Sequence, residues 1–164
     1  MKLYSYFRSS AAYRVRIALN LKSLEAKVIP VHLVKNGGEQ HSAEYCQINP
    51  SELLPALVED ASEGGFTLTQ SLSILEYLEE KHPETALLPQ NIEQRALIRA
   101  FSQSIACDIH PLNNLRVLQY LSHILTVSDE QKSAWYKHWV EVGFNGLETQ
   151  LKDSNGKFCF GESP

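Results

Sequence analysis

The sequence predicts an α/β unit with the element order βαβαββα, followed by an all-helical unit. Over residues 1–83, short strand-like runs alternate with runs in which apolar residues recur every three to four positions, as amphipathic helices require. Beyond this region only the helical period continues, over 92–125 and again over 128–152. We therefore expect two domains, 1–83 and 92–164, joined by a linker over 84–91.

The composition is that of an ordinary globular chain and limits the possible partners. The chain has 164 residues, 43% of them hydrophobic, and a formal net charge of -4, which argues against nucleic acid or an anionic membrane as partner. No apolar run reaches the roughly 18 residues of a membrane span, so we expect a cytoplasmic protein. Because Cys46, Cys107 and Cys159 are widely spaced, we expect reduced thiols and no metal.

The first predicted elements form a βαβ unit and a short helix. A strand over 2–7 leads into a helix over 10–21, whose wide apolar stripe requires a sheet to pack on. A second strand covers 26–33, where Pro30 indicates a sheet edge or a bulge. A weak helix over 39–48 follows a loop of asparagine and glycine.

The next elements extend the sheet and cover it. A strand over 54–59 and another over 66–68 are separated by a glycine turn, which predicts a hairpin. A helix over 70–81 follows and ends before Pro83. Its period places Leu72, Leu75 and Leu78 inside and Glu76, Glu79 and Glu80 outside.

The helical half contains one expected kink and one clear helix start. Pro111 interrupts the period, so we expect a kink near 107–112. Ser128 and Gln131 form a capping-box pattern, and the apolar rows after it, which include Trp135 and Trp139, are expected to pack on the preceding helix. The apolar residues Phe158, Cys159 and Phe160 should be buried. Ser163 and Pro164 resemble the start of a further helix, which suggests a longer natural chain.

The turn between the first strand and the first helix is suited to bind an anion. The unpaired N–H groups of a helix start and the helix dipole make Ser9, Ser10 and Ala11 such a site. A stabilisation of up to about 2 kcal/mol would lower the pKa of a bound thiol from about 8.5 to about 7, and a serine hydroxyl donating to the sulfur would add to this. The turn has no cysteine, so the thiol must arrive with a ligand. Alternatively, the two serines only cap the helix.

Segments spread over nearly the whole chain agree in order and spacing with one known family. They are Ser9 and Ser10 followed by RVRIAL at 14–19, Asn49 and Pro50 with Leu54 and Pro55, QSLSILEYL at 70–78, LLPQ at 87–90, residues 109–118 and GKFCFG at 156–161. Together they resemble the glutathione transferases, and within them the zeta class of maleylacetoacetate isomerases. The resemblance implies a thioredoxin-like first domain with a mixed four-stranded sheet, an all-α second domain, glutathione as cofactor and a homodimer.

The resemblance also implies which residues hold the cysteinyl part of glutathione. Ser9 would bind and activate the sulfur, with Ser10 beside it at the helix start. Leu54, ahead of a cis-Pro55, would pair its backbone with the cysteinyl unit in the manner of an added strand. In this interpretation the chain supplies the site, and the nucleophile belongs to the ligand.

The two ends of glutathione would meet other segments. Gln70 and Ser71, at the start of the third long helix, would take the γ-glutamyl group, whose carboxylate suits the positive end of a helix. Gln40 would reach the glycyl end. Each residue has a purely structural alternative, since Gln70 and Ser71 could only cap the helix and Gln40 could be only a loop residue.

The substrate-side residues also follow from the resemblance. His110 and Asn114 fall at positions that line the substrate cleft in relatives. Alternatively, His110 is only the residue before a helix-kinking proline. Relatives continue with further helices, one of which bears an arginine for the substrate carboxylate. Arg8 and Arg116 are candidates to replace it in part.

The function that the resemblance implies is a glutathione-dependent cis-trans isomerase converting maleylacetoacetate to fumarylacetoacetate in tyrosine and phenylalanine breakdown. The glutathione thiolate would add to the conjugated double bond and leave after rotation. Ala11 and Tyr13 replace the usual Cys and Trp, which need not abolish this chemistry. The alternatives are a general glutathione transferase or peroxidase acting on small electrophiles and a non-catalytic binding domain. Thioredoxin-type exchange is disfavoured, because the turn has no Cys-x-x-Cys.

Overall fold

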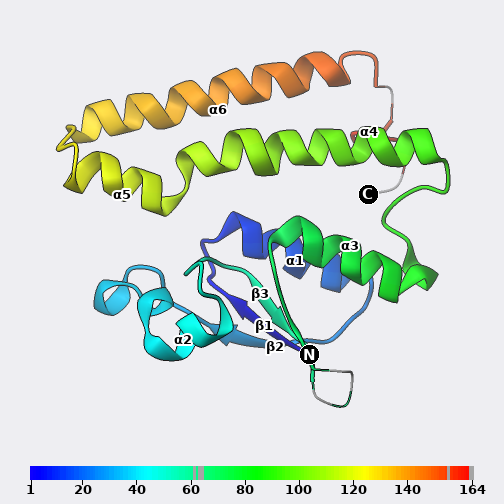
Figure 1. Ribbon diagram of the computed structural model, residues 1–164. Coiled ribbons are helices and arrows are strands. Elements are labelled where there is room, and N and C mark those ends of the chain that lie inside the picture. The colour runs from blue at the N-terminus through cyan, green and yellow to red at the C-terminus, as the bar shows by residue number, and fades with distance from the viewer. Residues whose placement is uncertain (61, 63–64, 155, 163–164) are drawn as a thin grey trace. The chain divides into compact units, whose positions relative to one another are not determined.

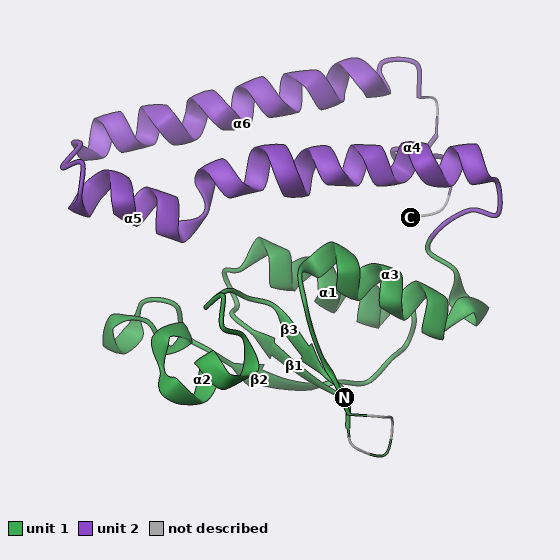
Figure 2. Cartoon of the chain, viewed as in Figure 1, with its two compact units in different colours: residues 1–87 green, residues 88–164 purple. Residues whose placement is uncertain are grey.

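The computed structural model describes residues 1–60, 62, 65–154 and 156–162, which form two compact units, Met1–Leu87 and Leu88–Pro164 (Figure 2). The boundary between the units falls inside the predicted linker 84–91. The first unit has the predicted order βαβαββα (Figure 1). Its elements are β1 Lys2–Ser5, α1 Ser10–Leu21, β2 Lys27–Pro30, the 3-10 turns η1 Lys35–Gly37 and η2 Glu39–His41, α2 Ala43–Ile48, β3 Ala56–Val58, β4 Thr67–Thr69, α3 Ser71–Lys81 and η4 Pro83–Thr85.

The sheet is mixed and four-stranded, in the order β2-β1-β3-β4. β1 runs parallel to β2 and antiparallel to β3, and β3 and β4 form the predicted antiparallel hairpin. Pro30 lies in β2 at the edge of the sheet, where its missing N–H leaves no ladder hydrogen bond unmade. The predicted strands are longer than the observed ones because their outer residues enter the connecting loops.

The two faces of the sheet bury different sets of side chains. Leu3 and Leu57 point to the face on which α1 and α3 pack side by side (Figure 1). The neighbouring residue Tyr4 points the opposite way, and its ring lies 5.7 Å from that of Tyr45 in α2. Each face therefore has its own apolar cluster. The first comprises Leu3, Val15, Leu19, Leu57, Ile74 and Leu78, and the second Tyr6, Val31, Tyr45 and Leu54.

The prediction that Glu79 faces outward is wrong. Its carboxylate is buried and forms an ion pair of 2.7 Å with Lys22, the C-cap residue of α1. Helix α3 packs against α1 as well as against the sheet, so side chains on two of its faces are covered. One row contains Ile74 and Leu78, which are fully buried, and the second contains Glu79. Leu72 and Leu75 are only partly buried. A charged residue can occupy the second row only because a buried cation pairs with it.

The regular elements described in the second unit are all helices, and they contain the predicted kink. Its elements are α4 Ile92–Gln103, the π-helix η5 Ser104–Ile109, the 3-10 helix η6 His110–Asn113, α5 Leu115–His123 and α6 Asp129–Leu151. The helix widens over η5 and tightens over η6 around Pro111, which has no N–H for the α-helical bond. No helix within the described residues is long and apolar enough to cross a membrane.

Helix α6 begins as predicted, but its apolar rows pack only in part, since Val142 and Phe144 of these rows are exposed. Ser128 and Gln131 form the reciprocal capping box, and the Trp135 indole donates to the Leu112 carbonyl at 2.9 Å. Phe158 and Phe160 are exposed, so their predicted burial is wrong. They lie in an irregular turn, where Phe158 bridges to Gly161 and Phe160 meets the ring of Phe101 edge-on at 5.2 Å. The suggested helix start at 163–164 lies outside the described residues.

Replacing two glycines of α6 with alanine should have opposite effects on stability. A Cβ at Gly143 would lie 2.4 Å from Cγ1 of the buried Ile109, whereas one at Gly146 would have nothing within 4 Å. Gly143→Ala should lower the free energy of unfolding by about 1–3 kcal/mol through overpacking. Gly146→Ala should raise it by up to about 1 kcal/mol through helix propensity. Urea unfolding of both variants tests this, and equal effects would contradict the close approach.

Candidate active site

Four segments meet at one end of the sheet of the first unit, where the strands β1 and β2 terminate. β1 and β2 are parallel and both end there, at Ser5 and Pro30. β3 begins there, with Ala56 opposite Tyr4, and β4 ends there, with Thr69 opposite Ala56. The turn before α1, the loop after β2, the residues before β3 and the start of α3 therefore converge. Two helix N-termini lie at this end of the sheet, and each brings a partial positive charge to it.

Ser9 is the N-cap of α1, and its Oγ accepts a hydrogen bond from the Ala12 N–H at 3.2 Å. Ser9 therefore does cap the helix, and this role is compatible with a further contact to a ligand. A hydroxyl accepts with its lone pairs and still has one proton to donate. The first turn of α1 contains no acidic residue that would compete with an anion. Ser10 is the exposed first residue of the helix, and Ser9 is half-buried.

The peptide bond between Leu54 and Pro55 is cis, as predicted, and comes directly before β3. The preceding carbonyl of Leu53 accepts hydrogen bonds from the Tyr45 hydroxyl at 2.6 Å and from Nδ2 of Asn49 at 2.7 Å. Burial raises the pKa of Tyr45 to about 12, so its phenol stays a donor at neutral pH. The side chains of Tyr45 and Asn49 therefore fix the backbone next to Leu54.

The start of α3 is the third part of the site. Gln70 has φ 68° and ψ 117°, a conformation that non-glycine residues rarely adopt, and its exposed side chain makes no capping hydrogen bond. Gln70 is thus the N-cap of α3 by position, without a capping bond from its side chain. Ser71 is buried, and its Oγ accepts from Nη1 of Arg14 at 3.1 Å. Arg14 joins α1 to α3 and adds a positive charge where the two helices begin.

Gln40 lies in η2, in the loop between β2 and α2, and only 5% of its surface is exposed. Its Nε2 is 2.9 Å from Nε2 of His41 and 3.5 Å from the Leu33 carbonyl oxygen. His41 Nδ1 in turn is 2.6 Å from Oε2 of Glu52. The amide also lies against Gly38, whose φ of 106° places the backbone in the region that favours glycine.

Cys46 lies next to this group and predicts a slow-reacting thiol. Its Sγ is 3.6 Å from Oε1 of Glu52, and burial, together with this hydrogen bond and charge, raises the pKa of the thiol. At neutral pH iodoacetamide should therefore alkylate Cys46 several times more slowly than the exposed Cys107 and Cys159. Glu52→Gln removes the negative charge and should speed the reaction at Cys46 alone. Peptide mass spectrometry measures all three rates, and an unchanged rate in Glu52→Gln would contradict this assignment.

The predicted substrate-side residues are divided between the two units. Arg8 lies exposed in the turn before α1, at the site edge. His110 begins η6, Asn114 is the N-cap of α5 and accepts from the Val117 N–H at 3.2 Å, and Arg116 is exposed in the first turn of α5. The last three lie around the kink of the second unit, and the sequence did not predict that Asn114 caps α5.

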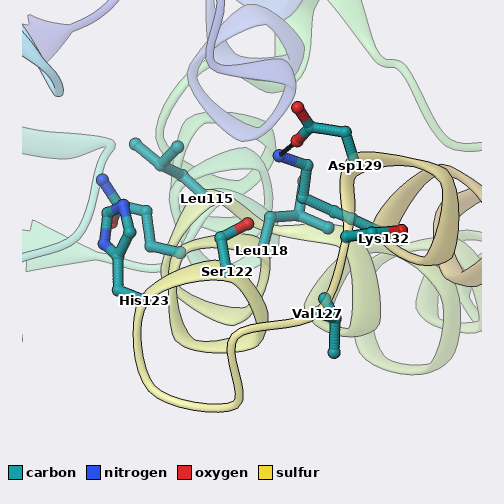
Figure 3. Close-up of a pocket in the computed structure, with 9 residues that line it drawn as sticks. Leu115, Leu118, Ser122, His123, Val127, Asp129 and Lys132 are labelled. Carbon is teal, nitrogen blue, oxygen red and sulfur yellow. Dashed lines mark hydrogen bonds and ion pairs between the residues drawn. The ribbon is translucent and has the colours of Figure 1, made fainter.

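The second unit also contains an open hollow of about 630 Å³ between α5 and the start of α6 (Figure 3). Leu115, Leu118 and Val127 line it with apolar surface, and the ion pair of Asp129 and Lys132, at 2.6 Å, lies at its rim. None of the predicted site residues lines this hollow. Within the described part of the chain, no three His, Cys, Asp or Glu side chains are grouped to hold a metal ion.

The chain resembles known proteins over almost its whole length. Residues 1–80 match the model of the glutathione S-transferase N-terminal domain. A probable maleylacetoacetate isomerase of Vibrio cholerae serotype O1 is 52% identical over 159 residues, which cover 97% of this chain and 72% of that protein. The maleylacetoacetate isomerase of Rattus norvegicus is 46% identical over 160 residues, 98% of this chain and 69% of that protein.

Solved structures agree with this likeness. The holo structure of a bacterial zeta-class maleyl pyruvate isomerase has a TM-score of 0.92 and 39% identity, covering 100% of this chain and 76% of that one. A maleylacetoacetate isomerase from Methylobacterium extorquens AM1 with bound malonate and glutathione has a TM-score of 0.90 and 38% identity, covering 99% and 75%. The chain belongs to the glutathione S-transferase family, in its zeta class.

Proposed function

We propose that this protein is a glutathione-dependent isomerase that converts maleylacetoacetate to fumarylacetoacetate. The observation that carries the proposal is the start of α1, where the N-cap residue Ser9 lies at the positive end of the helix, in a turn that contains neither an acidic residue nor a cysteine. Relatives named maleylacetoacetate isomerase support the substrate. The residues present suit glutathione, because two helix N-termini and Arg14 face its anionic groups and no acidic side chain lies in the first turn of either helix.

Glutathione, when bound, supplies a thiolate that adds to the conjugated double bond and departs after rotation about the bond. Ser9 donates a hydrogen bond from its hydroxyl group to the sulfur, and the positive end of α1, with Ser10 at its beginning, stabilises the negative charge. Both act on the charged form only, so they raise the fraction of thiolate at neutral pH. The chain therefore contributes orientation and charge stabilisation.

The remaining residues orient the tripeptide. The backbone of Leu54, which precedes the cis-Pro55, pairs with the cysteinyl unit of glutathione, as in strand addition. Gln70 and Ser71, together with Arg14, receive the γ-glutamyl group, and Gln40 meets the glycyl end.

We place the substrate near the remaining predicted residues. Arg8, His110, Asn114 and Arg116 serve the carboxylates and the carbonyl of the substrate in this proposal. It also includes a glutathione-binding domain over 1–83, a substrate-side domain over 92–164, a homodimer and a cytoplasmic location. The net charge of -4 disfavours nucleic acid as a partner in this proposal.

A second substrate is maleylpyruvate, favoured by the structural likeness to a maleyl pyruvate isomerase. Turnover of maleylacetone and of maleylpyruvate, each with and without glutathione, decides between the two. We expect isomerisation of maleylacetone that requires glutathione but does not consume it. A folded protein that binds glutathione and isomerises neither compound would contradict the proposal and favour conjugation of other electrophiles, such as chlorinated acids, or a binding role.

A further inference from the structure

Three side chains of the first unit form a row of short polar contacts. Glu52 Oε2 lies 2.6 Å from His41 Nδ1, and His41 Nε2 lies 2.9 Å from Nε2 of Gln40. The Gln40 amide is buried, and its Oε1 has no hydrogen-bond partner among the described residues. Buried polar atoms are nearly always paired in folded proteins, so this oxygen requires an explanation.

The chemistry of the row fixes the orientation of the amide. A carboxylate only accepts hydrogen bonds, so the proton of a neutral His41 ring resides on Nδ1, toward Glu52. His41 Nε2 is then an acceptor, and the partner atom of Gln40 must be its NH2 group. The same NH2 group points toward the Leu33 carbonyl oxygen at 3.5 Å. The amide is thereby held with its donors engaged and its acceptor oxygen unpaired.

Neighbouring groups support this arrangement. Cys46 Sγ, 3.6 Å from Oε1 of Glu52, donates its S–H, so both oxygens of that carboxylate accept. A Cβ on Gly38 would lie 2.6 Å from Nε2 and 2.8 Å from Oε1 of Gln40, so the backbone closes one side of the amide. The side chains of His41 and Glu52 are 52% and 42% exposed, and neither belongs to the apolar clusters of the core.

We propose that Glu52 and His41 are positioning residues that make Gln40 a hydrogen-bond acceptor for the ligand. The group that Gln40 receives is therefore an N–H and not a carboxylate. Resting on the proposed function, this group is the N–H of the peptide bond between cysteine and glycine in glutathione. A site built around a buried acceptor discriminates strongly against an analogue that lacks the donor.

The first experiment measures the tautomer of His41. Imidazole 15N chemical shifts of the full chain near neutral pH should show a protonated Nδ1 and an unprotonated Nε2, with the signals assigned by their loss in His41→Phe. In Glu52→Gln the populations should move toward the Nε2-protonated form, because an amide no longer requires a proton on Nδ1. A ring protonated at Nε2 in the unaltered protein would overturn the proposal, since Gln40 would then have to present its NH2 group.

The second experiment measures which ligand atom matters. Calorimetry compares glutathione with its ester analogue, in which oxygen replaces the glycyl N–H, and with γ-glutamylcysteine. The unaltered protein should bind the ester about tenfold or more weaker than glutathione. This ratio should fall toward one in Gln40→Met and in His41→Phe, while affinity for γ-glutamylcysteine stays unchanged. His138→Phe, an exposed histidine of α6, is the matched control and should keep the full ratio.

The outcomes separate this inference from the function on which it rests. Equal binding of glutathione and its ester would overturn the role of Gln40 and leave the isomerase proposal standing. Failure of the unaltered protein to bind any of the three peptides would contradict the proposed function and the ligand assignment together. A loss of affinity for γ-glutamylcysteine in His41→Phe would show a general disturbance of the fold and overturn the positioning role.

Discussion

Replacing Ser9 with alanine should lower kcat/KM for glutathione-dependent isomerisation by about 10- to 150-fold. A hydrogen bond to a charged group contributes about 1.5–3 kcal/mol, and the bond from Ser9 would be made to the thiolate only. The pKa of the bound thiol should rise for the same reason. The acid limb of the pH-rate profile should therefore move to higher pH, which stopped-flow or steady-state assays over pH 5–9 can measure.

Ser9 is also a helix cap, so a loss of stability has to be separated from a loss of chemistry. Ser9→Ala removes the acceptor of the Ala12 N–H and should cost about 1 kcal/mol of unfolding free energy. Ser128→Ala is the matched control, because it removes the same kind of cap from α6. Similar losses of stability with a loss of activity in Ser9→Ala alone would support the role. Equal activity of the two variants would contradict it.

Most of the fold follows from local signals in the sequence. The helix over 10–21 is predicted to the residue, because a serine pair starts it and an apolar stripe continues through Leu21. Pro30 at the sheet edge and Pro111 at the kink follow from the missing proline N–H. The prediction for the final residues is wrong because it rested on hydrophobicity alone. Whether Phe158 and Phe160 are buried depends on which elements pack around them.

The candidate site is only partly visible in the sequence. The serine pair and the proline before β3 lie in recognisable local patterns. The hydrogen bond from Arg14 to Ser71 joins residues 57 positions apart. The row of Gln40, His41 and Glu52 depends on the conformation of a loop, which the hydrophobic period of helices and strands does not predict. The signal in the sequence was Arg14 itself, a charged residue placed beside the apolar positions of the first helix.

Replacing Lys22 with methionine should lower the free energy of unfolding by about 3–5 kcal/mol, since it leaves a buried carboxylate without its cation. Lys22 is 4% exposed, and its Nζ also donates to the carbonyls of His82 at 2.9 Å and Thr85 at 2.7 Å. Glu79 in turn accepts the Leu87 N–H with both oxygens, at 3.0 and 2.9 Å. The pair thus fixes the chain that follows α3, and its loss should also speed amide exchange at Leu87.

The matched control for Lys22→Met is Lys137→Met. Lys137 pairs with Glu141 at 3.6 Å on the exposed side of α6, so the same substitution there should change stability by less than about 1 kcal/mol. Urea unfolding of the two variants and of the unaltered protein measures the difference. A buried charge is tolerated only when its partner is present, so the loss of unfolding free energy should be several-fold larger in Lys22→Met than in Lys137→Met. Equal, small losses would mean that water solvates the Glu79 carboxylate and that the Lys22 contact contributes no more than a surface pair.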